Sequence, residues 1–378
     1  MPVSQTQHPS TQADQRFMTR ALSLARRGAG YVEPNPMVGC VLVRGGKIVG
    51  EGYHRRFGGP HAEVDALRRC CCPTNGITLY VTLEPCCHQG KTPPCSAAII
   101  RAGIARVVVA TGDPNPLVCG KGIRKLRRAG ITVDVGLLRS EAAELIAPFS
   151  TLLRLKRPYV IAKWAQSLDG KLATTTGESK WISCPQSRRH VHRLRARVDA
   201  ILVGSETVRA DDPLLTARDV RVRRRALRVV LDSRLRAPEH CQLIDTAMRW
   251  PTLIMTTVIK AKSAKADRLR RGGAEVIGCR SNRNRIATKD WMAKLAQRGI
   301  SNLLVEGGPT VLSSLLESRL VDEAWVFTAP ILIGGRSARS LLDGRGVQRM
   351  VDAIEAKTVH TQSSGRDTLQ RLRLTTPG

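Results

Sequence analysis

One histidine and two cysteines in the first third of the chain have the residue types and spacing of a catalytic zinc site. His61 follows "GGP", Cys86 ends the segment "TLEPC", and Cys95 follows nine positions later. Three protein ligands leave the fourth tetrahedral position of Zn²⁺ to water, which is the catalytic rather than the structural pattern. Bound zinc lowers the pKa of that water toward neutrality, so such a site generates hydroxide.

Glu63 has the position of the proton carrier that a zinc hydroxide needs. It lies two residues after His61, so it can stand beside the metal without binding it, take a proton from the water and pass it to a departing amine. The H-x-E…P-C pattern is that of nucleobase deaminases, in which two residues separate the cysteines. Here eight residues separate them, and a histidine at a helix start near buried cysteines remains the alternative interpretation.

Alternating strands and helices must position these residues. We expect a helix from Asp14 to about Ala25, a strand hairpin over 38–53 and a helix over 61–69. Further strands are expected at 78–83, 106–111 and 131–136, and helices at 95–102, 123–129 and 140–155. The alternation predicts a layered α/β fold with a largely parallel sheet. His61 and Cys95 would then open helices, where the partial positive charge favours thiolates.

The charged, proline-containing segment "KRPY" at 156–159 marks an expected domain boundary. We expect a disordered polar tail at 1–13, one domain over 14–155 and a second over 156–378. The alternation of strands and helices restarts after the boundary. Strands are expected at 159–167, 200–205, 228–233, 252–257, 275–279, 302–308 and 323–334, with a solvated basic loop at 221–225.

The segment "LLVEGGPTV" at 303–311 is a candidate diphosphate cradle. An apolar strand leads into Glu306 and two glycines, and Pro309 suits the first position of a helix. Glycines let backbone N–H groups approach an anion, and the helix N-terminus adds partial positive charge. The second half contains no G-x-G-x-x-G and no P-loop, and this turn alone would also suit an ordinary strand-to-helix connection.

Longer stretches resemble the bifunctional riboflavin-biosynthesis family along nearly the whole chain. The segments "PNPMVGCVLV", "GEGYH", "GGPHAEVDAL", "TLEPCCHQGKTPPC" and "DPNP" resemble its deaminase half, which acts on a pyrimidinone carrying a ribosyl phosphate. The segments "KWAQSLDGKLAT", "GESKWIS", "LRARVDAILVGSETVRADDPLLTAR" and "VVLDS" resemble its NADPH-dependent reductase half. The resemblance implies a cytidine-deaminase-like three-layer domain followed by a dihydrofolate-reductase-like domain.

The resemblance also implies roles for individual residues. In the first domain it makes His61, Cys86 and Cys95 the zinc ligands, Glu63 the catalytic residue, and Asn35, His54 and His88 substrate contacts. In the second it implies NADPH contacts at Ala165, Trp181, Thr207, Asp211, Ser233, Gly308, Pro309, Thr310, Val311, Leu312, Ser313 and Ser314. Reductase substrate contacts are implied at Ser179, Arg195, Leu215, Arg218 and Glu306, and Lys163 and Asp169 are candidates for protonating the sugar.

Two groups of cysteines depart from the family pattern. Cys87 stands where the family usually has serine, and a second thiol beside a ligand offers zinc a competing donor. The run "CCC" at 70–72 lies outside the motifs, and we expect it to pack at a helix end.

The charge of the chain bears on its partners. The net charge is +30, which favours polyanions, but aromatic residues make up only 3%, which disfavours a base-stacking platform. This composition leads us to expect no nucleic acid partner, and the resemblance implies a small phosphorylated pyrimidine substrate. We also expect no membrane partner and a homo-oligomer. The alternative is an RNA-binding zinc base deaminase with a non-catalytic second domain.

The N-terminal sequence and the cysteine count bear on location. The first residues contain no basic-then-apolar signal segment, and eleven cysteines cannot all pair within one chain. The lack of a signal segment leads us to expect a cytoplasmic protein, and in that reducing compartment clustered thiols indicate metal binding or catalysis rather than bridges.

Overall fold

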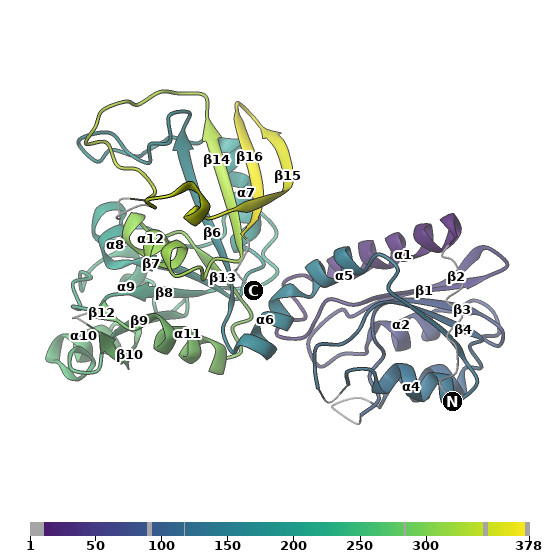
Figure 1. The fold of residues 1–378 in the computed structure, drawn as a ribbon. Helices are drawn as coiled ribbons and strands as arrows, with labels where there is room; N and C mark the ends of the chain where they lie inside the picture. The colour runs from purple at the N-terminus through teal and green to yellow at the C-terminus, as the bar shows by residue number, and fades with distance from the viewer. Residues whose placement is uncertain (1–10, 89–92, 117, 283–284, 343–346, 375–378) are drawn as a thin grey trace. The chain divides into compact units, whose positions relative to one another are not determined.

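The computed structural model describes residues 11–88, 93–116, 118–282, 285–342 and 347–374. The chain divides into two compact units, Met1–Lys156 and Arg157–Gly378 (Figure 1). Among the described residues, no helix has the length and apolar character needed to cross a bilayer.

The first unit is built on a five-stranded sheet with the order β2-β1-β3-β4-β5. β1 pairs antiparallel with β2 and β3, whereas β3, β4 and β5 are parallel. The strands are β1 Gly39–Arg44, β2 Lys47–Tyr53, β3 Thr78–Leu83, β4 Arg106–Thr111 and β5 Thr132–Val135.

Helices cover both faces of this sheet and give three layers. In Figure 1, α1 and α5 lie over one face, and α2 and α4 lie under the other. Val41 packs with α1, whereas its neighbour Leu42 packs with α2, because successive strand residues point to opposite faces. The helices are α1 Gln12–Ala25, η1 Arg26–Gly28, α2 Ala62–Arg68, α3 Cys95–Arg101, α4 Lys121–Arg128, α5 Arg139–Leu145 and α6 Ala147–Leu155.

Two helices differ from the sequence expectation. α1 begins at Gln12, because Thr11 and Asp14 form a reciprocal capping box. The single helix expected over 140–155 is wrong: α5 ends at Leu145, and α6 starts afresh with Pro148 in its first turn. Proline has no N–H to donate to the preceding turn, so it suits a helix start better than a helix interior.

The second unit contains a nine-stranded sheet with the order β10-β9-β8-β7-β13-β6-β14-β16-β15. The strands from β10 to β14 are parallel, and the last two join antiparallel. They are β6 Tyr159–Ser167, β7 Ala200–Gly204, β8 Leu227–Leu231, β9 Thr252–Thr257, β10 Glu275–Cys279, β13 Asn302–Val305, β14 Glu323–Ala329, β15 Ala356–Ser364 and β16 Asp367–Leu374. A small ladder pairs β11 Ser281–Asn282 with β12 Arg285–Ile286.

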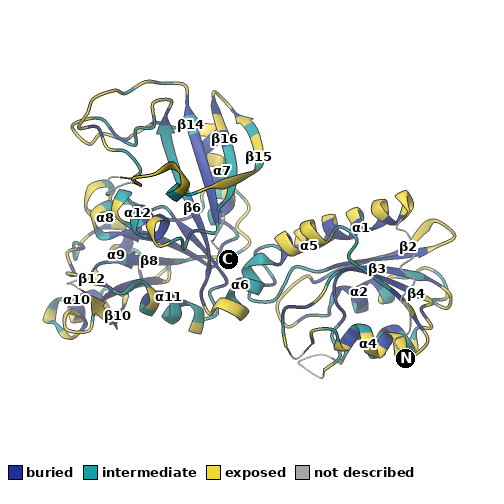
Figure 2. Cartoon of the chain, viewed as in Figure 1, coloured by how far each residue is buried: buried dark blue, intermediate teal, exposed yellow. Residues whose placement is uncertain are grey.

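The hairpin of β15 and β16 is absent from the sequence expectation. Its strands carry many polar residues and are mostly exposed or half-buried (Figure 2). They join the edge of the sheet through β14, so only one side of them packs on a core.

Helices of the second unit pack on the nine-stranded sheet. Trp291 and Leu295 of α11, with Leu312 and Leu316 of α12, pack on sheet residues such as Leu202. The helices are α7 Pro185–Arg195, α8 Ser205–Asp211, α9 Gln242–Asp245, η2 Lys260–Lys262, α10 Ala264–Arg271, α11 Thr288–Gln297, α12 Pro309–Glu317 and η3 Met350–Asp352. The carboxyl ends of the parallel strands β7, β8 and β13 meet at one edge, where ligands bind in open α/β sheets.

Two candidate active sites

Three potential metal ligands converge in the first unit. The Nδ1 atom of His61 lies 3.2 Å from the sulfur of Cys95 and 3.6 Å from that of Cys86. All three donor atoms lie within 4.8 Å of one another. With the usual zinc–sulfur and zinc–nitrogen bond lengths, tetrahedral zinc holds its ligand atoms roughly 3.5 Å apart. The donors therefore already have the spacing of a zinc site. Cys87 does not belong to this group of donors.

Local backbone features place these ligands. His61 is the N-cap of α2, and Cys95 is the first residue of α3. A Cβ on Gly52 of β2 would come within 2.3 Å of the Ala66 nitrogen, so glycine lets α2 lie directly on the strand. The backbone N–H of Cys95 donates to the Cys86 sulfur at 3.3 Å and favours a thiolate there.

Two thiols and one carboxyl group show perturbed proton affinities in this site. A hydrogen bond from the Cys95 thiol lowers the pKa of Cys86, and the same bond together with burial raises the pKa of Cys95. Glu63 is 3% exposed, and burial raises the pKa of its carboxyl group to about 7. Glu63 is thus a buried carboxyl group beside the three donors and is not one of them.

Asn35 and His54 contact each other, whereas His88 is exposed. The His54 Nδ1 atom is 3.0 Å from the Pro60 carbonyl oxygen, which can only accept, so Nδ1 carries the proton. The Nε2 atom then accepts from the Asn35 amide at 3.2 Å. Burial lowers the pKa of His54, which agrees with a neutral ring. His88 is exposed, and residues 89–92 of the long cysteine gap lie outside the described residues.

Glu84 is a structural anchor that the sequence reasoning did not single out. Its buried carboxylate accepts four backbone N–H groups, at distances from 2.9 to 3.3 Å, from Asp113, Gly120, Gly122 and Ile123. These bonds hold Asp113 and the start of α4 against the strand end that leads into Cys86. The signal in the sequence was an ionisable residue directly after an apolar strand.

An open cleft of about 1520 Å³ lies in the second unit. All the residues predicted to contact cofactor or reductase substrate line this cleft except Ser313, and Lys163 lines it too. The Ser313 hydroxyl donates to the Leu341 carbonyl oxygen at 2.9 Å. Asp169 is not among the lining residues; it accepts from the Ser167 hydroxyl and from the amides of Ile333 and Gly334, and so anchors a loop.

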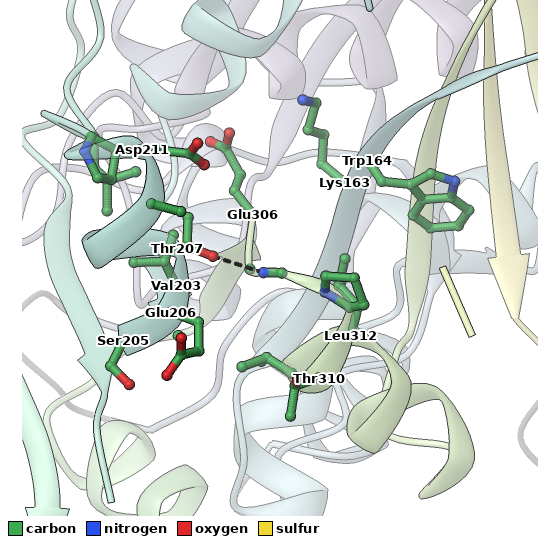
Figure 3. A pocket seen from close by; sticks show the side chains of 18 of the residues that line it. Lys163, Trp164, Val203, Ser205, Glu206, Thr207, Asp211, Glu306, Thr310 and Leu312 are labelled. Atoms are coloured by element: carbon green, nitrogen blue, oxygen red, sulfur yellow. Dashed lines mark hydrogen bonds between the residues drawn. The ribbon is translucent and has the colours of Figure 1, made fainter. Parts of the chain in front are cut away.

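The glycine turn after β13 joins two helices at the cleft. The Gly308 N–H donates to the Thr207 hydroxyl of α8 at 3.0 Å, as the dashed line in Figure 3 marks. A Cβ on Gly307 would come within 3.1 Å of Val311, and one on Gly308 within 3.2 Å of Thr207. Larger residues would therefore crowd the turn, whereas the glycines leave the N-terminus of α12 accessible to a diphosphate.

Arg195 and Glu306 form a bidentate ion pair at this cleft. Arg195 Nε lies 2.6 Å from one Glu306 oxygen, and its Nη2 lies 2.8 Å from the other. Burial alone would raise the pKa of Glu306, but the Arg195 guanidinium holds that pKa below its ordinary value. Burial lowers the pKa of Lys163, with Glu306 opposing the effect.

Arg188 is a cleft residue that the sequence reasoning missed. Its guanidinium lies 4.4 Å from the centre of the Trp181 ring, and its Nη1 donates to the Ser183 carbonyl oxygen at 2.6 Å. It thereby holds the exposed Trp181 ring in place. A basic residue one helical turn into α7 gave no sequence signal for this contact.

Family models match both units. The model of the cytidine and deoxycytidylate deaminase zinc-binding region matches residues 11–111. The model of the RibD C-terminal domain matches residues 158–370. The two matches follow one another along the chain, one in each compact unit.

Near full-length relatives carry both parts. The riboflavin biosynthesis protein RibD of Aquifex aeolicus is 46% identical and covers 94% of this chain and 96% of its own length. That of Actinobacillus pleuropneumoniae is 43% identical and covers 95% of each chain.

Solved structures of full-length relatives have the same fold. Acinetobacter baumannii RibD, form 1, is 35% identical, with a TM-score of 0.83 over 97% of this chain and 99% of its own. A diaminohydroxyphosphoribosylaminopyrimidine deaminase/5-amino-6-(5-phosphoribosylamino)uracil reductase from Thermotoga maritima is 36% identical, with a TM-score of 0.83 over 96% and 98%. The chain therefore belongs to the RibD family and is a bifunctional deaminase and reductase of riboflavin biosynthesis.

Proposed function

We propose that the first site deaminates a diamino-ribosylamino-pyrimidinone phosphate and that the second reduces the deaminated product with NADPH. The observation that carries the proposal is a group of three zinc-type donors with Glu63 buried beside it as a non-ligating carboxyl group. The cleft with its glycine turn supplies the second half. Relatives named for both reactions align with this chain over nearly its full length.

In the deaminase site, His61, Cys86 and Cys95 would hold zinc. When bound, zinc would act as a Lewis acid and make hydroxide available from water near neutral pH. Glu63 takes a proton from the water at its carboxylate oxygen and delivers it to the amine nitrogen of the substrate. The carbon–nitrogen bond breaks, ammonia leaves, and a ring carbonyl remains, so one water is consumed for each ammonia released.

Asn35 and His54 orient the substrate ring in this proposal. Because the Pro60 carbonyl fixes the His54 tautomer, Asn35 keeps its amide oxygen and its second N–H for a polar ring edge. His88, exposed and on the segment after Cys86, is assigned to the phosphorylated sugar. The proposed mechanism assigns no step to Cys87.

In the reductase site, the cleft residues bind cofactor and sugar side by side. When bound, NADPH supplies a hydride to C1′ of the sugar. Lys163 gives a proton to the ring oxygen as the bond from C1′ to that oxygen breaks, so proton and hydride together yield the open ribityl chain. Arg195 holds Glu306 in place for the sugar hydroxyls, and the Arg218 guanidinium binds the phosphate.

Cofactor, partner and location follow from the same sites. The proposal requires zinc in the first unit and NADPH in the second, and a small phosphorylated pyrimidine as substrate. No nucleic acid partner is required, and a homo-oligomer is assigned by family analogy alone. A centre that depends on free thiolates supports the proposal of a reducing, cytoplasmic location.

A coupled assay tests the proposal. Purified full-length protein is incubated with the pyrimidinone phosphate, and ammonia release and loss of the reduced-nicotinamide absorbance are followed together. Ammonia should appear without NADPH, whereas nicotinamide oxidation should require prior deamination. Absence of ammonia release from zinc-loaded protein would overturn the first assignment. Deamination of a structured RNA in place of the small substrate would favour the RNA-binding alternative.

A further inference from the structure

We propose that His192 of α7 is a positioning residue of the reductase site, whose neutral ring holds the backbone of Arg218 so that the Arg218 guanidinium meets the substrate phosphate. Both residues line the same cleft as Glu306. The inference rests on the proposed reductase function and adds a residue that sets the affinity for the phosphorylated sugar. His192 is not among the residues that the family resemblance implies.

One face of α7 is directed at the cleft. Arg188, His192 and Arg195 follow one another at intervals of four and three residues, which is the spacing of neighbours on one side of a helix. All three line the cleft, and the two arginines hold other cleft side chains in place. His192 is the middle residue of this face, and it contacts the cleft segment that follows Leu215.

The contact is a hydrogen bond from the backbone of Arg218 to the imidazole ring. The Arg218 N–H donates to the Nδ1 atom of His192 at 3.2 Å. An N–H group can only donate, so Nδ1 must offer a lone pair, and the neutral ring then carries its proton on Nε2. Arg195 holds the same segment, because its Nη1 atom donates to the Thr216 carbonyl oxygen at 3.3 Å. Two residues of one helical face thus fix the backbone on either side of Ala217.

The backbone of the 215–219 segment requires such anchors. Leu215 and Asp219 have φ values of 52° and 59°, in the left-handed region that costs energy for a residue other than glycine. Leu215 is buried, whereas Arg218 is exposed. The bond to His192 therefore fixes the exposed end of the segment, whose arginine side chain lines the cleft. A backbone that is already fixed lowers the ordering cost of phosphate binding.

The groups around His192 favour its neutral form. Arg195 on the same helix, Arg218 on the neighbouring segment and Glu306 after β13 are the charged groups that act on the ring. Burial and the two guanidinium groups lower the pKa of His192, and Glu306 and the Thr216 backbone oppose them. The ring therefore accepts the Arg218 N–H at neutral pH. Protonation would turn the acceptor into a second donor and add positive charge beside two arginines, so the segment would lose this anchor in acid.

Steady-state kinetics of the full-length enzyme with NADPH and the deaminated ribosyl phosphate test this role. His192→Ala should raise the KM for that substrate about 3- to 10-fold, the usual effect of one lost hydrogen bond. The turnover number, the KM for NADPH and the ammonia release should stay within about twofold of wild type. His192→Gln should restore most of the affinity at neutral pH, because its amide oxygen can accept the same N–H. With the phosphate-free ribosyl compound, wild type and His192→Ala should have equal KM values.

The pH dependence of the substrate KM gives a readout that a purely structural residue would not change. The substrate phosphate itself titrates near about pH 6 with every variant, so the difference between wild type and His192→Gln reports the ring. As the pH falls from about 7.5 to 5.5, the KM should rise more steeply in wild type, because glutamine does not ionise. A shallower rise in wild type than in His192→Gln would indicate a direct bond from a protonated ring to the phosphate and would overturn the positioning role.

His190→Ala is the matched control. His190 lies on the same helix, and burial lowers its pKa too, but it is not among the described residues that line the cleft. Its replacement should leave the substrate KM and the pH dependence of that KM unchanged. An unchanged KM in His192→Ala, or an equal rise in His190→Ala, would overturn the inference and leave the proposed function standing. A wild-type enzyme that does not reduce this substrate would instead overturn the proposed function and the inference with it.

Discussion

Arg195 of α7 and Glu306 after β13 bind each other through two parallel hydrogen bonds of 2.6 and 2.8 Å. The family resemblance implies that both residues contact the reductase substrate. Because Glu306 occupies the guanidinium fork of Arg195, the direct effect of Arg195 in this structure is to hold the Glu306 carboxylate in place. We therefore propose Arg218, which lines the same cleft, for the phosphate contact.

Replacement of Glu306 by glutamine should impair the second activity alone. The variant leaves the Arg195 charge buried without a counter-charge, which costs about 3–5 kcal/mol in comparable buried pairs. We expect reductase activity to fall at least about 100-fold, with ammonia release unchanged. Denaturant unfolding and both activity assays check this. Glu275→Gln, which breaks the more exposed pair with Arg298, should lower the unfolding free energy by less than about 1 kcal/mol.

The same pair predicts how acid affects the second unit. Burial opposes ionisation of Glu306, but the attraction of the Arg195 guanidinium outweighs it and keeps the folded-state pKa of Glu306 below its unfolded value. A depressed carboxyl pKa contributes stability above the unfolded pKa, and that stability is lost as the pH falls through the folded value. Unfolding free energy should therefore decline below about pH 4. The decline should be shallower in Glu306→Gln, and an identical decline in both proteins would contradict the account.

Lys163 should set the alkaline limit of the reductase. Burial lowers its pKa, and only the charged form, present below that pKa, can donate a proton to the sugar. The turnover number should fall as the pH rises through a value below the roughly 10.4 of a free lysine. Lys163→Gln should reduce turnover with little change in the affinity for NADPH. An unchanged alkaline limb in a still-active Lys163→Gln enzyme would remove Lys163 from the mechanism.

The zinc ligands can be separated from their neighbouring thiol by metal analysis. Cys86→Ser and Cys95→Ser should lower bound zinc from about one ion per chain to a small fraction, since each removes a thiolate ligand. Cys87→Ser is the matched control, because Cys87 adjoins a ligand but does not belong to the donor group. It should keep both zinc and ammonia release. Zinc loss from the Cys87 variant would assign that thiol to the metal.

Glu84 should matter for stability and for metal retention. Its carboxylate accepts four backbone N–H groups, and a glutamine would turn an amide donor toward some of them. Each unsatisfied buried donor costs about 1–3 kcal/mol. Glu84→Gln should therefore destabilise the first unit and speed zinc loss to a chelator. Glu141→Gln, at an exposed position of α5, should do neither, and equal rates of zinc loss in both variants would contradict the role of Glu84.

Sequence patterns were informative where apolar periodicity or a fixed ligand spacing was strong. The strands β3, β4 and β13 are largely buried and rich in apolar residues, and the donor atoms of His61, Cys86 and Cys95 lie together. The three donors could be expected to meet because strand pairing brings segments from separate parts of the chain to one sheet edge.

Other features had no local signal. The edge hairpin of β15 and β16 is largely polar because it packs on one side only. The ion pair between Arg195 and Glu306 joins residues 111 positions apart, and neither residue type indicates its partner. The side chain of Asp169 is of a type that can act as a catalytic acid. In the folded chain it instead binds Ser167, Ile333 and Gly334, and these contacts have no signal in the sequence.

The central claim is that one chain carries two independent active sites acting in sequence. The most direct test measures the ribityl product when two single-site variants, Glu63→Gln and Glu306→Gln, are mixed with the pyrimidinone phosphate and NADPH. Each variant alone should fail to make the ribityl product, the first for lack of deamination and the second for lack of reduction. The mixture should make it, because the deaminated intermediate released by one protein is reduced by the other. Failure of the mixture to make the ribityl product, or loss of ammonia release in Glu306→Gln alone, would contradict two separate sites.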